Sequence, residues 1–82
     1  MKTYILYYSS YCPFCIRVLY ALNGKEHSVE LRETDNPKYR IELQQGGGKT
    51  QVPCLRIEKE GRIQWMYESG DIIQYLKQQK II

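Results

Sequence analysis

The segment TYILYYSSYCPFC, residues 3–15, sets the architecture that this chain is expected to adopt. Residues 3–8 form a nearly continuous apolar run rich in residues that favour strands, which is typical of a strand buried on both faces. Residues 9–11 are a short connection, and Cys12-Pro13 then predicts the start of a helix, because a proline at the first helical position has no N–H to leave unpaired. The segment therefore predicts a buried strand that leads directly into a helix with two cysteines at its start.

The pattern after this segment predicts the rest of the first half of the chain. The first helix is expected to end at Gly24, and because it is apolar on nearly all sides it should be largely buried. Polar and apolar residues then alternate over residues 27–32. This alternation predicts a half-buried strand that carries Val29 and Leu31 on one face.

A second and more polar helix is expected after this strand. Asp35 or Asn36, followed by Pro37, predicts its start, and the pattern carries it through about Gln44. The three glycines 46–48 predict a flexible loop at its end. The residues expected to anchor this helix are Tyr39, Leu43 and Ile41.

The last third of the chain predicts a hairpin and a final helix. Residues 54–58 and 63–65 alternate around a glycine-containing turn, which indicates two short antiparallel strands. Ser69 is expected to cap the final helix. The buried face of this helix is formed by Ile72, Ile73, Tyr75 and Leu76. The resulting order, βαβαββα, predicts an α/β fold in which three helices flank a four-stranded mixed sheet.

Composition limits both the size and the partners of the protein. The chain has 82 residues, enough for one small domain over residues 1–82. Its formal charge of +3 comes from Lys and Arg residues spread along the chain, which argues against a nucleic-acid partner. No apolar run approaches the roughly 20 residues of a membrane span, and the first residues lack the features of a signal peptide. We therefore expect a cytoplasmic monomer without a membrane partner.

Cysteine spacing carries the strongest chemical signal. Three cysteines, two of them only three positions apart, make a poor disulfide framework and suit redox chemistry or a metal site better. Cys12-Pro13-Phe14-Cys15 follows a buried strand and opens a helix, which is the context of a thioredoxin-like redox centre. The unpaired N–H groups and the dipole at the helix N-terminus should stabilise the Cys12 thiolate. Cys12 is therefore expected to be the exposed nucleophile and Cys15, one turn deeper, the resolving thiol.

A structural zinc site is the alternative to a redox centre. Zinc needs about four ligands. The available candidates are Cys12, Cys15, Cys54 and His27. Because they include no second closely spaced ligand pair, their spacing matches no common zinc pattern. The sequence accordingly favours the redox centre, with no metal ligand assigned, and Cys54 is expected to be a small packed residue at the start of a strand.

Cys-Pro-Phe-Cys after a strand resembles the active-site motif of dithiol glutaredoxins. The segment TQVP, residues 50–53, resembles the one before the third strand in the superfamily of glutaredoxins and glutathione transferases. In that superfamily the proline is cis, and the backbone of the preceding residue pairs with bound glutathione like one more strand. The resemblance implies a thioredoxin-like three-layer fold and places Val52 opposite Cys12. The glutathione-binding residues implied in this part of the chain are Tyr11, Phe14, Gln51, Val52 and Pro53.

Another motif, Glu68-Ser69 before the last helix, resembles the γ-glutamyl site of glutathione transferases and of the larger, transferase-like bacterial glutaredoxins. A capped helix start with exposed N–H groups can also bind an anion on physical grounds alone. The resemblance implies that Ser69 and the backbone hold a carboxylate of glutathione and that Glu68 holds its ammonium group. The alternative interpretation is an N-cap without a ligand, which is the commoner meaning of a serine before an amphipathic helix.

The chain departs from the family pattern in two ways. Many glutaredoxins carry Lys or Arg three residues before the first cysteine, where it meets the glycyl carboxylate of glutathione. This chain has Ser9 at that position, and Gln51 or Lys49 is a candidate replacement. Transferases and the large glutaredoxins continue into a helical second domain, which residues 1–82 do not contain. For that reason the sequence favours a glutaredoxin over a transferase.

The resemblance as a whole implies a glutathione-dependent thiol-disulfide oxidoreductase that reduces protein disulfides and glutathione mixed disulfides. Glutathione is then a co-substrate, no cofactor is expected to be tightly bound, and the partners are glutathionylated or disulfide-bonded proteins. Two alternatives stay open: a module that binds an iron–sulfur cluster through Cys12 and glutathione, and a thioredoxin-type reductant that ignores glutathione. Pro13 argues against the cluster, since cluster-binding family members usually have a more open, glycine-containing motif.

Overall fold

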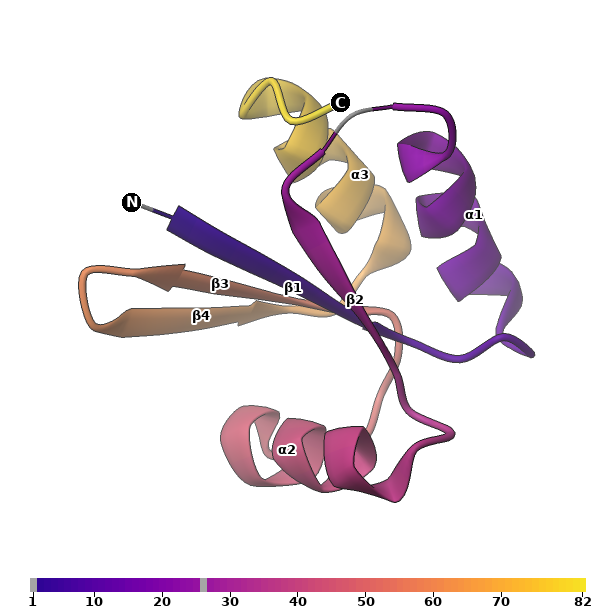
Figure 1. Ribbon diagram of the computed structural model, residues 1–82, viewed down its shortest axis with the longest axis vertical. Coiled ribbons are helices and arrows are strands. Elements are labelled where there is room, and N and C mark those ends of the chain that lie inside the picture. The colour runs from indigo at the N-terminus through magenta and orange to yellow at the C-terminus, as the bar shows by residue number, and fades with distance from the viewer. Residues whose placement is uncertain (1, 26) are drawn as a thin grey trace.

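Four strands and three helices follow one another along the part of the chain that the computed structural model describes, residues 2–25 and 27–82 (Figure 1). They are β1 (Lys2–Tyr8), α1 (Pro13–Leu22), β2 (Val29–Glu33), α2 (Pro37–Gly47), β3 (Cys54–Lys59), β4 (Arg62–Met66) and α3 (Ser69–Gln78). This order confirms the predicted βαβαββα arrangement. Among the described residues, no helix combines the length and the apolar character that crossing a membrane requires.

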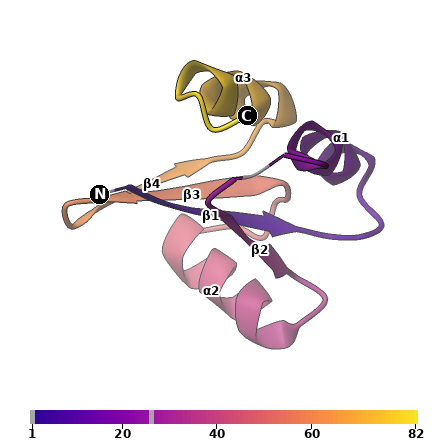
Figure 2. The same cartoon turned by 45° about the horizontal axis from the view of Figure 1, so that its top comes forward.

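The strands form one mixed sheet in the order β2-β1-β3-β4. β1 pairs with β2 in parallel and with β3 antiparallel, and in the second pairing Tyr7 lies opposite Cys54. β4 pairs with β3 antiparallel, as expected for a hairpin. Figure 2 shows α1 and α3 on one face of the sheet and α2 on the other. The predicted four-stranded mixed sheet flanked by three helices is therefore confirmed.

β1 is apolar throughout its middle because helices cover both of its faces. Tyr4 and Leu6 belong to the core beneath α1 and α3, whereas Ile5 and Tyr7 belong to a second core beneath α2. None of these four side chains is more than 7% exposed. A strand covered on both sides needs no polar face, which explains the continuous apolar run of residues 3–8. The prediction of a strand buried on both faces is confirmed.

α1 is less buried than its apolar composition predicts. The buried residues of this helix are Cys15, Val18 and Leu22, while Phe14 is 58% and Tyr20 is 73% exposed. α1 lies on the sheet next to α3, so one stripe of its surface meets the core and the rest faces outward. The expectation of a largely buried helix is therefore wrong, because an apolar pattern does not tell how many neighbours cover a helix.

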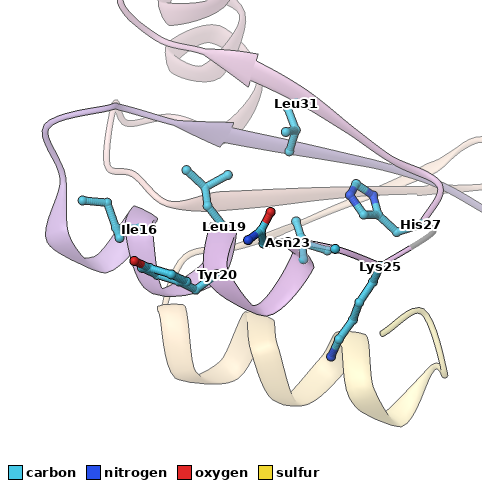
Figure 3. Close-up of a pocket in the computed structure, with 9 residues that line it drawn as sticks. Ile16, Leu19, Tyr20, Asn23, Lys25, His27 and Leu31 are labelled. Carbon is cyan, nitrogen blue, oxygen red and sulfur yellow. The ribbon is translucent and has the colours of Figure 1, made fainter.

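A hollow of about 410 Å³ lies between α1 and the edge strand β2 (Figure 3). Ile16 and Tyr20 line it from the helix and Leu31 from the strand. Leu31 is 43% exposed, whereas Val29, on the same face of the strand, is buried. The expectation that both residues turn toward the core is therefore wrong for Leu31, because α1 leaves this part of the sheet edge uncovered.

α2 extends further than the sequence predicts. It begins after Asn36, whose side chain caps the Lys38 N–H, and it runs to Gly47 rather than to Gln44. Gly48 follows as the C-cap, in the left-handed region at φ +85°. The prediction of a flexible glycine loop is therefore wrong for two of the three glycines. Ile41 is 51% exposed, so the expectation that it anchors the helix is also wrong.

Two aromatic side chains, Trp65 of β4 and Tyr67 directly after it, pack so closely against Gly46 and Gly47 that no Cβ atom fits at either position. A Cβ atom on Gly46 would lie 2.4 Å from Cζ2 of Trp65, and one on Gly47 would lie 2.2 Å from the Tyr67 hydroxyl oxygen. The Tyr67 hydroxyl also donates a hydrogen bond to the Gly47 carbonyl at 2.8 Å. Because they have no side chain, the two glycines allow α2 to pack closely against the sheet.

Gly46→Ala is expected to lower the free energy of unfolding by about 1–3 kcal/mol, because the new methyl group must displace the Trp65 ring. Urea unfolding followed by circular dichroism measures the change. Gly70→Ala is the matched control, since a Cβ atom at Gly70 meets nothing within 4 Å and alanine favours a helix. Equal stability losses in the two variants would contradict the packing role of Gly46.

Candidate active site

Cys12 lies where the connection from β1 meets α1, as the N-cap residue of that helix. Its Sγ accepts a hydrogen bond from the Cys15 N–H at 3.3 Å, and its own N–H donates to the Ser9 carbonyl at 3.3 Å. Pro13 follows at the first helical position, where no N–H partner is needed. The sulfur thus stands at the positive end of the helix, where N–H groups and the helix dipole stabilise a thiolate.

Cys15 is fully buried in the first turn of α1, next to Cys12. Burial, together with the hydrogen bond to the Cys12 thiol, raises the pKa of Cys15 to about 12, although the Ser9 N–H, 3.5 Å from its Sγ, opposes this shift. Cys15 is therefore a protonated thiol near neutral pH. Cys12 is partly exposed, so it is the thiol of this pair that a disulfide in solution can reach.

The third cysteine, Cys54, begins β3 and packs beneath α2 with Ile5, Tyr7 and Leu43. It is fully buried, and burial raises its pKa to about 12 against the opposing effect of the Tyr67 hydroxyl. Cys54 thus occupies the packed position at a strand start that the sequence predicts. Within residues 2–25 and 27–82, no three His, Cys, Asp or Glu side chains form a group that could hold a metal ion.

Iodoacetamide is expected to label the native protein predominantly at Cys12 at pH 8, because Cys12 is partly exposed whereas Cys15 and Cys54 are fully buried and have raised pKa values. A thiol with a pKa of about 12 is ionised in only about one molecule in 10⁴ at this pH, and raising the pH by one unit increases that fraction about tenfold. Peptide mass spectrometry measures labelling at each cysteine, with the protein unfolded in urea as the control. Native labelling of Cys54 as fast as that of Cys12 would contradict this difference in burial and ionisation.

Val52 faces Cys12 from the loop that joins α2 to β3. The Val52–Pro53 peptide bond is cis, and the Cys12 Sγ lies 3.8 Å from the Val52 carbonyl oxygen, to which the thiol donates. β1 and β3 are neighbours in the sheet, and the pairing of Tyr7 with Cys54 brings the loops at their ends together. Segments far apart in the sequence therefore meet at one edge of the sheet.

A cleft of about 490 Å³ borders the Cys12–Val52 contact. It is formed by α1, the loop before β3 and the start of α3. Six residues that the sequence assigns to the site line this cleft: Phe14, Gln51, Val52, Pro53, Glu68 and Ser69. Tyr11 does not line it and is 86% exposed beside Cys12 in the chain. Lys49, a candidate replacement for the missing basic residue at position 9, lies outside the cleft lining, with its Nζ 4.2 Å from the centre of the Tyr67 ring.

Four residues that line the cleft were not predicted from the sequence: Arg17, Tyr67, Gly70 and Asp71. A signal existed for Arg17, since it follows Phe14 by three positions and so shares its face of α1. Asp71 lies in the first turn of α3, two positions after Ser69. Tyr67 directly follows β4, and no local pattern distinguishes it from the other tyrosines.

α3 begins at the cleft, with a different cap from the one predicted. Glu68 is the N-cap residue and its side chain makes no capping hydrogen bond, whereas Ser69 is the first helical residue and is 7% exposed. The prediction that Ser69 caps the helix is therefore wrong, because a residue within the first turn does not have the extended backbone of an N-cap. The Ile72 N–H bonds to the Glu68 carbonyl at 2.8 Å. The N–H groups before Ile72 are the ones that an anion in the cleft can bind.

The model of the glutathione S-transferase N-terminal domain matches residues 6–80, which include the cysteine pair, the Val52 loop and the start of α3. The chain belongs to this family. This family agrees with the resemblance to glutathione transferases that the sequence shows at Glu68-Ser69. The match covers the whole predicted site, from Tyr11 to Ser69.

The domain resembles proteins that are about three times its length. It is 35% identical over 77 residues to pyrimidodiazepine synthase of Drosophila melanogaster, covering 90% of this chain and 30% of that protein. It is similar to the structure of glutathione transferase Omega 3C from Trametes versicolor, with a TM-score of 0.72, 25% identity, and coverage of 94% of this chain and 33% of that one. For maleylacetoacetate isomerase from Anaeromyxobacter dehalogenans 2CP-1, solved with glutathione in the active site, the TM-score is 0.58, the identity 25%, and the coverage 95% and 38%. The domain thus spans about a third of the length of these relatives.

Glutaredoxin C1 from Populus tremula x tremuloides is a further structural neighbour of the domain. The TM-score is 0.58 at 18% identity, and the match covers 92% of this chain and 74% of that one. At such low identity the likeness concerns the fold alone. It confirms the predicted thioredoxin-like three-layer fold, which transferases and a glutaredoxin share with this domain.

Proposed function

We propose that this domain is a glutathione-dependent thiol-disulfide oxidoreductase, a glutaredoxin in activity, that reduces protein disulfides and glutathione mixed disulfides. The observation that carries the proposal is the placement of Cys12 as a partly exposed thiol at the start of α1, hydrogen-bonded by the Cys15 N–H and beside the Val52 carbonyl. A thiol so placed can form and break disulfide bonds through its thiolate. The related maleylacetoacetate isomerase with bound glutathione supports glutathione as the ligand of the cleft.

Glutathione in this proposal lies in the cleft with its sulfur at Cys12 and its backbone paired with that of Val52. Its γ-glutamyl ammonium group meets the carboxylate of Glu68. Its γ-glutamyl carboxylate meets Ser69 and the free N–H groups at the start of α3, where the helix dipole favours a negative charge. The remaining contacts that we propose are Tyr11, Phe14, Gln51 and Pro53.

The proposed reaction has two thiol-disulfide exchanges. The Cys12 thiolate attacks the glutathione sulfur of a protein–glutathione mixed disulfide, so that a Cys12–glutathione disulfide forms and the protein thiolate leaves and takes up a proton. A second glutathione, as thiolate, attacks the glutathione sulfur of this intermediate. Glutathione disulfide forms, and Cys12 is released as a thiolate. For a disulfide within a protein, the Cys12 thiolate attacks one sulfur, so that a Cys12–protein disulfide forms and the first protein thiol leaves. The Cys15 thiolate then attacks the Cys12 sulfur, which closes the Cys12–Cys15 disulfide and releases the second protein thiol. Two molecules of glutathione reduce this disulfide and leave as glutathione disulfide.

The reducing equivalents come, by family analogy, from NADPH through glutathione reductase. We also propose that the protein works in the cytoplasm, where a reducing glutathione pool keeps thiols free.

The direct test is the reduction of the mixed disulfide between glutathione and 2-mercaptoethanol, coupled to NADPH oxidation through glutathione reductase. Turnover that saturates with glutathione is the expected result. A folded protein that gives no turnover in this assay, but accepts electrons directly from a flavoprotein thioredoxin reductase, would show that the domain is a thioredoxin-type reductant instead.

Glu68→Gln is expected to raise the KM for glutathione about 3- to 10-fold with kcat nearly unchanged, because it removes the charge that meets the γ-glutamyl ammonium group and leaves the thiols in place. The coupled assay at varied glutathione concentrations measures both constants. Glu60→Gln is the matched control, since it removes the same charge at the tip of the β3–β4 hairpin. An unchanged KM in Glu68→Gln would refute the assigned role of Glu68.

A further inference from the structure

Three positively charged side chains lie next to one another at one end of the sheet, although they come from distant parts of the sequence. The strand register pairs Lys2 of β1 with Lys59 of β3, and Lys59 with Arg62 of β4. Residues that are directly opposite in antiparallel strands share one face of the sheet, so these three form a single row, here called the cation row. Figure 1 shows this end of the sheet, where the N-terminal end of β1 lies beside the β3–β4 turn.

The described chain does not neutralise the cation row by contact. Within residues 2–25 and 27–82 none of its three members forms an ion pair, whereas Arg32 and Arg56 both contact glutamates. Lys2 instead donates a hydrogen bond to the uncharged side chain of Gln79 at 3.1 Å. Like charges directly opposite one another in a sheet are destabilising. The free protein therefore carries a local repulsion that a bound anion would relieve.

A hollow of about 370 Å³ borders the cation row. All three members of the row line it, together with Gln64 of β4 and Tyr75 of α3, whose amide and hydroxyl groups can donate hydrogen bonds. Among the described residues no carboxylate lines this hollow, and Glu60, in the turn between Lys59 and Arg62, lines a different one. The hollow thus presents several positive charges and hydrogen-bond donors to one compact anion.

We propose that the cation row and its hollow bind a ligand that carries two or three phosphate groups close together. A lysine binds phosphate as a point charge, and the planar guanidinium of Arg62 can donate two parallel hydrogen bonds to one phosphate group. Neighbouring cations of the row are one strand spacing apart, about 4.8 Å, whereas an extended acidic peptide places the carboxylates of one face about 7 Å apart. A short phosphate chain concentrates its charge within the width of the row and so matches it better.

The proposed phosphate site is separate from the proposed active site. β1 runs from Lys2 to Tyr8, and the loop to Cys12 begins only after Tyr8. The length of this strand places the two sites at opposite ends of the sheet, about 20 Å apart along β1. Phosphate binding is therefore measured without thiol chemistry, and neither proposal depends on the outcome of the other.

The test titrates inorganic tripolyphosphate into the protein at low salt and follows the amide chemical shifts by NMR. The Kd for tripolyphosphate is expected to be at least about tenfold lower than that for orthophosphate, because a single phosphate group cannot meet all three cations. Lys59→Gln, at the centre of the row, is expected to raise the Kd for tripolyphosphate about 3- to 10-fold. Lys38→Gln, an exposed position on α2, is the matched control and should leave this Kd within about twofold.

Thermal unfolding of the same proteins gives a second measurement. Saturating tripolyphosphate should raise the Tm of the natural protein and of Lys38→Gln more than that of Lys59→Gln, because it stabilises the folded state in proportion to its binding. Without the anion and at low salt, Lys59→Gln should unfold about 1–4 °C above the natural protein, since it removes the repulsion at the centre of the row. High salt should reduce this gain by screening the charges.

Equal losses of affinity in Lys59→Gln and Lys38→Gln would overturn the proposal, because binding would then follow net charge alone. Equal affinities for tripolyphosphate and orthophosphate would overturn it too, and so would tighter binding of a peptide with alternating glutamates, which would indicate an acidic protein partner. Vesicles of phosphatidylcholine with phosphatidylinositol bisphosphate identify the source of the phosphates. Binding to these vesicles that Lys59→Gln weakens would support a lipid headgroup, and binding of tripolyphosphate without binding of vesicles would support a soluble phosphate ester.

Discussion

Cys12→Ser is expected to lower the glutathione-dependent reduction of mixed disulfides by at least about a thousandfold, because the first exchange forms a bond to the Cys12 sulfur and the second exchange breaks that bond. A serine hydroxyl can occupy the same N-cap position and accept the Cys15 N–H, so the helix start should survive the substitution. Initial rates in the NADPH-coupled assay give the loss of activity. Thermal unfolding of the same preparation shows whether the fold is kept.

Cys54→Ala is the matched control for the loss of one thiol. Cys54 packs beneath α2, and its burial keeps it protonated and out of contact with solvent. Its replacement is expected to leave the turnover number within about twofold of the natural protein, at some cost in stability. Substantial activity in Cys12→Ser, or a comparable loss of turnover in a folded Cys54→Ala protein, would refute Cys12 as the single nucleophile.

Cys15→Ser is expected to separate two activities. Reduction of glutathione mixed disulfides should stay within about threefold of the natural rate, because Cys12 and glutathione suffice for it. Reduction of a disulfide within a protein should fall by at least about a hundredfold, because Cys15 must close the internal disulfide. The measurement compares the two substrates, a mixed disulfide and a small disulfide-bonded protein, in the same coupled assay.

The raised pKa of Cys15 adds a pH signature to this comparison. Cys15 must lose its proton to attack Cys12, and below its pKa of about 12 its thiolate fraction rises with pH. In the natural protein, the reduction of protein disulfides should therefore keep increasing with pH above about pH 9, where glutathione, with the pKa of an ordinary thiol near 8.5, is already mostly thiolate and the reduction of mixed disulfides levels off. Equal losses of both activities in Cys15→Ser would show that the two cysteines do not divide the reaction in this way.

The order of strands and helices was predictable because each element carries its own signal. The apolar run over residues 3–8, the alternation over 54–58 and the proline at position 13 are local patterns, and the structure confirms the elements that they predict. What covers an element is not local. Tyr20 and Leu31 are exposed because of where α1 lies on the sheet and because β2 is an edge strand of that sheet. Neither the position of the helix nor the order of the strands can be predicted from the local sequence pattern.

The glycines at the end of α2 also show that local sequence patterns do not reveal tertiary neighbours. Glycine usually weakens a helix, so the sequence predicts that the helix ends before them. The decisive neighbour of Gly46 is Trp65, which comes from a strand that follows much later in the chain. Tertiary packing overrides local propensity here, and a single sequence does not show that contact.

The sequence predicts which residues belong to the candidate site better than it predicts how they are arranged. The chemistry of Cys12 and Cys15 follows from their spacing at a helix start, and the residues near Val52 and Glu68 were found through the resemblance to a family. That Val52 and Glu68 line one cleft, and that Val52 also contacts Cys12, depends on the folded sheet. Arg17 belongs to none of the three motifs, and its spacing from Phe14 indicates a shared helix face but not that this face borders a cleft.

The register between β1 and β3 determines whether the site exists at all. Tyr7 pairs with Cys54, and this alignment fixes the distance between the loops that carry Cys12 and Val52. A slip by one residue would turn Leu55 away from its core and move Val52 off the Cys12 sulfur in the same step. The pairing also joins distant parts of the chain, which form contact late compared with a helix. We therefore expect refolding after dilution from urea to be slower than that of a helical bundle of the same length, with catalysis recovered only as this pairing forms.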